Sequence, residues 1–461
     1  MARAGGALSG LMFEQPDQRP EAAARSDAVV SLEQLLSHNA RRTPDALALL
    51  DPPDRVRFCE GGARRQTYAQ LERAVNAAAY RLNELALPPG SVVGLQLPNT
   101  GEAIVMLLAV MRARLVSALL PLSWRETDII SALRSSDAAA MITCQRVGTV
   151  EHAQIALAAA VEVTGIRYLC GFGSTLPDGF VPLDDVFGTD RHLAAENHSR
   201  QSPCPIAVMT FDRQSRGPIP FARNHVELFA GGLAVMMEAS LQRGATILST
   251  ILTGSFAGLA SAVIPWLLTG GTLALHHPFD PDVLAEQMDS DAVDAIIVPG
   301  AILEPLLNDP RFSQQMERRT FLALRRLPEQ PPGLMPEAFP SRLVDIIALG
   351  EWGVVPMRQD ANSAPTQLRS GAWTPSGAAE GTPALLRIGR TLHQTVAIGG
   401  AMTPHEPFPS SSQRHYDQDR LVDTGIAWPG VPASTRSNKN AASLESAFEL
   451  DHIEVSRASV A

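Results

Sequence analysis

Lysine is almost absent from this sequence of 461 residues. Lysine and arginine together number 38, and Lys439 is the single lysine, so the basic residues are nearly all arginine. A coding bias toward arginine and alanine accounts for this composition. It still limits the chemistry, because any reaction step that needs a lysine amine must use Lys439 or a lysine from a second chain.

Cysteine is scarce and scattered. Its four positions, Cys59, Cys144, Cys170 and Cys204, show no CxxC or CxxH spacing. This pattern is typical of reduced thiols in a cytosolic protein, and it predicts no metal site. The first 30 residues carry acidic side chains early and lack a sustained apolar core. We therefore expect no signal peptide and a cytoplasmic location.

Positive charge does not dominate the chain either. The formal net charge is −10, and binding to nucleic acid needs clustered positive charge, so we expect no nucleic-acid partner. Charge is also missing from residues 244–275, a stretch long enough to span a bilayer. Turn-forming residues at 253–255, Pro265 and Gly270-Gly271 break this stretch into pieces of strand or helix length. A buried strand, helix and strand are therefore predicted, and no membrane span.

What the sequence does contain is an alternation of apolar strand-length runs with amphipathic helix-length runs. Residues 67–82 and 126–135 are predicted helices, and 55–58 and 92–97 are predicted strands. Such alternation predicts an α/β protein with parallel sheets covered by helices on both faces. We expect a disordered leader (1–30), a first α/β subdomain (31–200), a second one (201–345), a β-rich subdomain (346–430) and a loose tail (431–461).

Residues 208–225 form a polar, turn-rich stretch between an apolar run at 206–209 and a helix predicted to begin near Asn224. A strand, a flexible loop and a helix N-terminus commonly hold a phosphate, because backbone N–H groups point outward there and the helix dipole favours an anion. This loop has one glycine, two prolines and no lysine. The residues alone leave open whether it holds a nucleotide.

Several short segments, in their order and spacing, resemble the large N-terminal domain of the adenylate-forming superfamily of acyl-CoA synthetases, aryl-CoA ligases and luciferase-like enzymes. The resemblance spans residues 31–430 and rests on 67–71, 88–99, 121–128, 133–138 and 271–280. It implies two doubly wound α/β subdomains and a small distorted β-rich subdomain. It also implies ATP-dependent conversion of a fatty or aryl carboxylic acid to an acyl adenylate and then to acyl-CoA, with ATP, Mg²⁺ and coenzyme A as cofactors.

The resemblance assigns phosphate-binding positions to the polar stretch. Where the family carries a loop of the form TSGTTGxPKG, Thr210 matches the first threonine, Ser215 a later threonine and Arg216 the last glycine. Arg213 and Arg216 are candidate replacements for the missing lysine, because a guanidinium binds phosphate well. An ordinary surface loop is the alternative, since bulky residues stand where glycines would let the backbone close on a phosphate.

Other family positions can also be located. Glu351 stands where the family glutamate helps to hold Mg²⁺, and Ser255 and Gly258 stand at the acyl pocket. Thr424 begins the ribose-binding motif, in which Ile426 replaces an aspartate and cannot accept hydrogen bonds from ribose hydroxyls. As a single glutamate after a strand, Glu351 could equally be a structural residue.

The resemblance further implies a C-terminal domain that carries a catalytic lysine and closes over the site. The chain ends soon after Thr424, and Lys439 falls in the predicted tail, so we expect this lid domain to be missing. Three hypotheses follow. The chain is a ligase, or a non-catalytic pseudoenzyme that binds an acyl group or a partner, or one half of a split ligase whose separate C-terminal domain brings the lysine.

Overall fold

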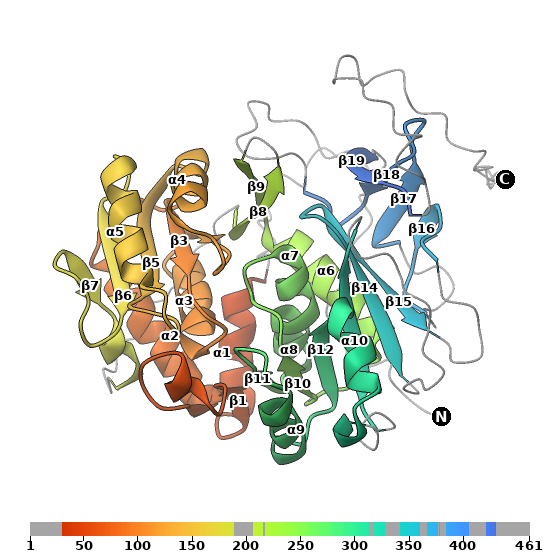
Figure 1. Ribbon diagram of the computed structural model, residues 1–461, viewed down its shortest axis with the longest axis horizontal. Helices are drawn as coiled ribbons and strands as arrows, with labels where there is room; N and C mark the ends of the chain where they lie inside the picture. The colour runs from red at the N-terminus through yellow and green to blue at the C-terminus, as the bar shows by residue number, and fades with distance from the viewer. Residues whose placement is uncertain are drawn as a thin grey trace, which may run out of the picture.

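The computed structural model describes residues 30–188, 206–214, 217–312, 318–327, 342–359, 367–376, 378, 384–404 and 421–429. Within these residues the chain forms two large, mostly parallel sheets and one small antiparallel sheet. The two large sheets and their helices stand beside one another, and the small sheet lies at one end (Figure 1). The predicted α/β class, with two doubly wound units and a small β-rich unit, is confirmed.

The first large sheet has seven strands in the described part of the chain, and all its pairs are parallel except the last. Their order is β7 (Phe180–Pro182), β6 (Tyr168–Phe172), β5 (Ala138–Cys144), β3 (Val92–Gln96), β4 (Val116–Leu119), β8 (Val208–Gln214) and β9 (Gly217–Arg223). Strands β3 and β4 are buried along their whole length, as expected for central parallel strands covered on both faces.

Helices cover both faces of this sheet. They are α1 (Leu32–Arg42), α2 (Tyr68–Asn83), α3 (Gly101–Arg112), α4 (Glu126–Ser135) and α5 (His152–Glu162), with short 3₁₀ turns η1 (Arg55–Arg57) and η2 (Asp184–Phe187). Alternate side chains of β3 separate the two layers, because Val93 and Leu95 pack with α2 and α3 while Val92 packs with α4 and α5. Every residue of α3 is buried, which explains why its sequence is apolar on all sides.

The second large sheet has eight strands among the described residues. Their order is β15 (Gly353–Gln359), β14 (Leu343–Leu349), β13 (Thr320–Arg326), β12 (Ala295–Pro299), β10 (Thr246–Ser249), β11 (Thr272–Leu275), β1 (Leu47–Leu50) and β2 (Arg65–Thr67). The pairs at both edges, β14–β15 and β1–β2, are antiparallel, and the inner pairs are parallel. Strands from both ends of the sequence therefore share one sheet.

The helices of the second unit also form two layers. They are α6 (His225–Glu238), α7 (Phe256–Gly258), a π-helical turn η4 (Leu259–Val263), α8 (Ile264–Thr269), α9 (Pro281–Ser290) and α10 (Gly300–Leu307). Side chains of α6 and α8 share a core with Ile247 and Ile297, whereas α9 and α10 pack with Leu248 and Ile296 on the opposite face. The small sheet contains β16 (Gly371–Trp373), β17 (Leu386–Arg390), β18 (Thr395–Gly399) and β19 (Val422–Ala427).

Local signals fix where the clearest helices begin and end. The Thr67 side chain accepts a hydrogen bond from the Gln70 N–H, and the Gln70 side chain accepts one from the Thr67 N–H, which makes a capping box at the start of α2. Asn224 and Glu227 make the same arrangement at the start of α6. Helix α8 ends at Gly270, whose φ of 62° is the left-handed conformation that glycine adopts at helix C-termini.

The uncharged stretch at 244–275 is the buried strand, helix and strand that its turn residues predict. It contains β10, then α7, η4 and α8, then β11, and nearly all of these residues are buried. In the described part of the chain, no helix has the length and apolar character needed to cross a membrane.

Other expectations are corrected. The segment predicted as a strand at 55–58 is the 3₁₀ turn η1, because the Arg55 side chain turns inward to two carboxylates instead of pairing along a sheet. The polar stretch is not an open loop, since β8 and β9 pair along their whole length as an antiparallel hairpin. The expected subdomain limits stay a prediction; in the described structure β8 and β9 belong to the first sheet, and β1, β2, β14 and β15 to the second.

Candidate functional site

The hairpin β8–β9 has two faces of different character. Its register pairs Val208 with Arg223, Thr210 with Phe221 and Asp212 with Ile219. Because successive side chains of a strand point to opposite faces, Thr210, Phe221 and Arg223 share one face and Arg213 lies on the other. In Figure 1 this hairpin lies between the two large sheets, close to α7. We call the Thr210 side the inner face.

The outer face packs against α4 of the first unit. The Phe211 ring makes an edge contact with Trp124 at 5.8 Å between centroids, and Arg213 Nη2 pairs with Asp128 Oδ1 at 3.3 Å. The structure therefore does not bring Arg213 together with Thr210, as a shared phosphate site would require. Ser215 and Arg216, the other predicted phosphate residues, lie outside the described residues.

The inner face brings Thr210 together with Glu351, as the resemblance implies. Glu351 follows β14 in the tight turn to β15 and is completely buried. Burial raises the pKa of this carboxyl, while the charges of Arg326 and Arg223, the Phe256 N–H and the Thr210 hydroxyl act to lower it. Glu351 Oε2 accepts a hydrogen bond from the Phe256 N–H at 2.8 Å. Its other oxygen, Oε1, makes no hydrogen bond, and the Arg326 guanidinium lies 3.8 Å away from it.

Arg223 is the residue of this face that the sequence did not single out. Its guanidinium is fully buried and lies over the Phe256 ring, 3.7 Å from the centroid. Nη2 donates to the backbone oxygens of Glu351 and Trp352, whereas Nε and Nη1 have no hydrogen-bond partner. Burial lowers the pKa of Arg223 to about 10, against the charges of Glu351 and Glu227. A buried cation thus joins the hairpin to the turn that carries Glu351.

Ser255 and Gly258, the predicted acyl-pocket residues, belong to the same neighbourhood. Ser255 caps the short helix α7, because its Oγ accepts a hydrogen bond from the Gly258 N–H at 3.1 Å. A Cβ on Gly258 would stand 2.3 Å from the Leu252 carbonyl oxygen, so only glycine fits there. The next residue after Ser255, Phe256, donates to Glu351. Both predicted positions therefore have structural tasks beside Glu351, and their role toward an acyl group stays a prediction.

Thr424 lies in β19 of the small sheet, two residues before Ile426. Its hydroxyl donates to the Val396 carbonyl oxygen at 2.7 Å, so this side chain is engaged within the sheet. Gly350 precedes Glu351 with a φ of 54°, and a Cβ there would come within 2.9 Å of an Asp212 carboxylate oxygen and 3.7 Å of Ile426. The hairpin, the Glu351 turn and β19 therefore meet at Gly350.

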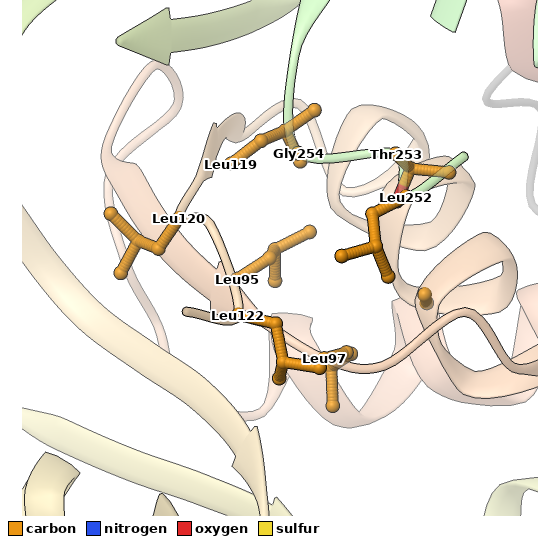
Figure 2. Close-up of a pocket in the computed structure, with 9 residues that line it drawn as sticks. Leu95, Leu97, Leu119, Leu120, Leu122, Leu252, Thr253 and Gly254 are labelled. Atoms are coloured by element: carbon orange, nitrogen blue, oxygen red, sulfur yellow. The ribbon is translucent and has the colours of Figure 1, made fainter. Parts of the chain in front are cut away.

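An apolar cavity lies next to the Ser255 segment. It is lined mainly by leucines at the ends of β3 and β4, and by Leu252, Thr253 and Gly254 from the loop after β10, which crosses above them in Figure 2. Its volume is about 20 Å³, which is room for roughly one water molecule. In the present conformation this cavity is too small for an acyl chain or an aryl ring.

Mg²⁺ does not fit the surroundings of Glu351. Mg²⁺ is usually held by one or two ionised carboxylates together with water and substrate phosphates. Here burial favours the protonated carboxyl, one of its oxygens is bound to a backbone N–H, and two guanidinium groups lie nearby. The described residues also contain no cluster of three or more His, Cys, Asp or Glu side chains placed to hold a metal ion.

The chain is similar in sequence to known proteins. Residues 36–178 match the family model described as AMP-binding enzyme. The chain is 23% identical over 281 residues to a 2-hydroxy-7-methoxy-5-methyl-1-naphthoate–CoA ligase of Streptomyces carzinostaticus, covering 59% of this chain and 49% of that protein. It is 41% identical over 83 residues to a salicyl-AMP ligase / salicyl-S-ArCP synthetase of Mycobacterium tuberculosis, covering 18% of this chain and 14% of that protein. The chain thus spans half or less of the length of these relatives.

The fold is also similar to that of solved structures. The N-terminal domain of FACL13 from Mycobacterium tuberculosis superposes with a TM-score of 0.61 at 17% identity, covering 86% of this chain and 96% of that one. At this identity the likeness shows the fold alone, and it agrees with the two parallel-rich sheets and the small antiparallel sheet described above. Residues 36–178 are therefore similar in sequence to AMP-binding enzymes, and the chain is similar in fold to the N-terminal domain of FACL13.

Proposed function

We propose that this chain derives from enzymes that activate a fatty or aryl carboxylic acid with ATP, forming an acyl adenylate and then an acyl-CoA, and that the chain alone catalyses this reaction poorly. Relatives named as CoA ligases and AMP ligases support the reaction class. The burial and raised pKa of Glu351 support the poor catalysis. The burial of Glu351 is the main observation that supports poor catalysis.

The hairpin supplies a second reason for poor catalysis. A phosphate site at the inner face needs positive charge that can reach solvent. Of the hairpin's arginines that the structure describes, Arg223 on the inner face is sealed under Phe256 and Arg213 is turned to α4. We propose that any catalytic lysine comes from a further domain, on the same polypeptide or on a separate chain, because Lys439 is the one lysine of this sequence.

A non-catalytic role is the second candidate, and one observation favours it. The Glu351 carboxylate is already bound to the Phe256 N–H, and Phe256 in turn lies against Arg223. A backbone N–H of the protein thus engages one of the two carboxylate oxygens with which the family would hold a metal ion, while Oε1 makes no hydrogen bond. A protein with this arrangement could bind an acyl group or a protein partner on the same fold without making an adenylate.

Carboxylate-dependent exchange of pyrophosphate into ATP tests the proposal directly. With a panel of fatty and aryl acids, we expect exchange near background for this chain alone and clear exchange after addition of a lysine-bearing C-terminal domain. Strong exchange by the chain alone would show that the Glu351 site is competent and would overturn the proposed impairment. No exchange in any combination, together with measurable binding of an acid by calorimetry, would favour the non-catalytic role.

The metal dependence of any exchange separates the two uses of Glu351. If Glu351 is structural, Glu351→Gln should leave the Mg²⁺ titration of exchange unchanged. A shift of that titration to higher Mg²⁺ would make Glu351 a metal ligand in the working enzyme. The matched control is Glu102→Gln, a buried glutamate in the first unit that lies outside this site.

A further inference from the structure

Cys59 and Cys144 lie beside one another although 84 residues separate them in the sequence. Cys144 is the last residue of β5, and Cys59 follows the 3₁₀ turn η1. A backbone hydrogen bond from the Gly148 N–H to the Phe58 carbonyl oxygen, 2.7 Å long, holds the two segments together. Each thiol is the largest influence on the pKa of the other, and Cys144 Sγ also donates to the Arg146 carbonyl oxygen at 3.7 Å. The fold therefore brings two free, buried thiols into one neighbourhood.

The surroundings of the two thiols are unequal. The hydrogen bond from Cys144 lowers the pKa of Cys59, and the nearby Arg55 guanidinium acts in the same direction, against burial and the charge of Glu102. The same pairing and burial raise the pKa of Cys144. Because the thiolate is the reactive form, Cys59 is the nucleophile of the pair and Cys144 the thiol that can resolve its oxidised form.

Access is also unequal. Cys59 is 8% exposed and Cys144 3% exposed. Cys59 stands just before Gly61 and Gly62, which are exposed, and a side chain added at Gly62 would meet no atom within 4 Å. Because Cys59 has the larger exposed fraction, we expect a small oxidant to reach Cys59 before Cys144. Cys170, in β6, is 1% exposed, and burial raises its pKa to about 12, so we expect it to be inert.

We propose that Cys59 and Cys144 are an oxidisable dithiol that a hydroperoxide converts to an intramolecular disulfide, which ties the η1 turn to the carboxyl end of β5. The Cys59 thiolate attacks one oxygen of hydrogen peroxide, the O–O bond breaks, and the departing hydroxide takes up a proton as water. Cys59 is then a sulfenic acid. The Cys144 sulfur attacks the Cys59 sulfur, the S–O bond breaks, and a second water leaves with the Cys144 proton. Two thiols and one peroxide thus give one disulfide and two waters.

The bond would act on a segment that carries buried charge. Arg55 in η1 binds Asp51 at 3.0 Å and Glu102 of α3 at 2.6 Å, and the Cys59 N–H donates to the Arg55 carbonyl oxygen. Fixing Cys59 to β5 would therefore fix the whole turn against the start of α3. This inference does not depend on the proposed function, because neither thiol belongs to the Glu351 neighbourhood.

Peptide mapping of the full chain tests the proposal. The protein is treated with increasing hydrogen peroxide, free thiols are alkylated, and the digest is analysed by mass spectrometry without reduction. We expect a peptide pair linked through Cys59 and Cys144, two hydrogens lighter than the reduced pair and restored by dithiothreitol. Cys59→Ser and Cys144→Ser should each abolish this pair, and Cys170→Ala should leave it unchanged.

The result on the wild-type chain decides the question even if a variant fails to fold. Alkylation of both thiols at peroxide levels that oxidise exposed methionines would overturn the proposal. So would a sulfinic acid at Cys59 with no cross-link, or a disulfide that joins Cys59 to Cys170 or Cys204. The oxidised wild-type chain should also unfold at a higher temperature than the reduced one, and an equal or lower temperature would show that the bond does not fit the folded state.

Discussion

Glu351 and Glu102 are buried carboxyl groups whose surroundings act in opposite directions, so the same change to glutamine should have opposite effects. Both are at most 3% exposed. Burial raises the pKa of Glu351. Burial also acts to raise the pKa of Glu102, but the hydrogen bonds and charges of Arg55 and Arg64 overcome it and hold that pKa at about 2. One carboxylate is poorly compensated and the other is strongly paired.

The expected loss for Glu102→Gln follows from this pairing. A fall in pKa from 4.5 to about 2 corresponds to about 3 kcal/mol, because each unit is about 1.4 kcal/mol. Breaking one partner out of a buried ionic network costs about 3–5 kcal/mol in other proteins. Asp51 remains beside the two arginines and compensates them in part. We therefore expect Glu102→Gln to lower the free energy of unfolding near pH 7 by about 3 kcal/mol.

Glu351→Gln should instead keep or increase stability. Glutamine retains an oxygen that accepts from the Phe256 N–H and removes the cost of burying a charge. The variant loses the attraction between Glu351 and Arg326, whose side chain is 42% exposed and lies 3.8 Å away. That attraction is worth under about 1 kcal/mol. The variant also loses the negative charge that partly compensates the buried Arg223. Near pH 8 we expect a gain in the free energy of unfolding of about 0–1 kcal/mol, since a net raised pKa means that the charged form is disfavoured.

The two variants should also differ in their dependence on pH. Because the folded pKa of Glu351 is raised, its contribution to stability is complete below the unfolded value of 4.5 and is lost as pH rises through the folded pKa. The folded pKa of Glu102 is lowered, so its contribution is present above 4.5 and is lost as pH falls toward about 2. Glu351→Gln should therefore abolish the fall in unfolding free energy that the wild type shows as the pH rises. Glu102→Gln should abolish the fall that the wild type shows as the pH drops.

Urea unfolding followed by tryptophan fluorescence, from about pH 3 to pH 9 with and without Mg²⁺, measures both effects. A loss near pH 8 in Glu351→Gln as large as that in Glu102→Gln would refute the reasoning, because Glu351 would then be a well-paired carboxylate. A stabilisation of the wild type by Mg²⁺ that disappears in Glu351→Gln would refute it in another way, since the residue would then be a metal ligand.

Three further changes test the packing around the site. Gly258→Ala should lower the unfolding free energy by at least about 2 kcal/mol through overpacking. Gly62→Ala, the control with open space at its Cβ, should change the unfolding free energy by under about 0.5 kcal/mol. Equal thermal midpoints for the two variants would contradict the close contact at Gly258. Arg223→Met should lower the unfolding free energy by about 2 kcal/mol. The variant loses two hydrogen bonds from a charged group, worth about 3–6 kcal/mol together, but it regains about 3 kcal/mol because no charge is buried. Arg213→Met, which removes an exposed ion pair, should cost under about 1 kcal/mol, and the same cost for both arginines in urea unfolding would argue against the buried clamp. Thr210→Val removes a buried hydroxyl without a geometrically complete hydrogen bond, so the unfolding free energy should stay within about 1 kcal/mol of the wild type, and a larger loss would show that the hydroxyl is paired.

The fold could be predicted wherever its signals are local. The helix expected at 126–135 is α4 with those limits, and the strand expected at 92–97 is β3 to within one residue. A capping box and a 3.6-residue apolar period belong to one segment, so one sequence is enough to find them. Which strands share a sheet depends on partners far along the chain. For this reason the sequence did not show that β1 pairs with β11, across more than 200 residues.

The candidate site was predicted in part, and the reason lies in the period of the hairpin. In a loop that wraps around a phosphate, consecutive residues can face the same ligand. A loop at this stretch would therefore place Thr210 and Arg213 in one phosphate site. Once the stretch is a strand, side chains alternate, and an odd spacing of three residues sends Arg213 to the opposite face. The same alternation places Arg223 beside Phe221 and Thr210 on the inner face. An arginine in an otherwise apolar seven-residue strand, directly before a helix cap, was the available signal for a buried cation. Thr210 and Glu351 do lie near each other in the fold, and their roles toward phosphate and metal stay predictions.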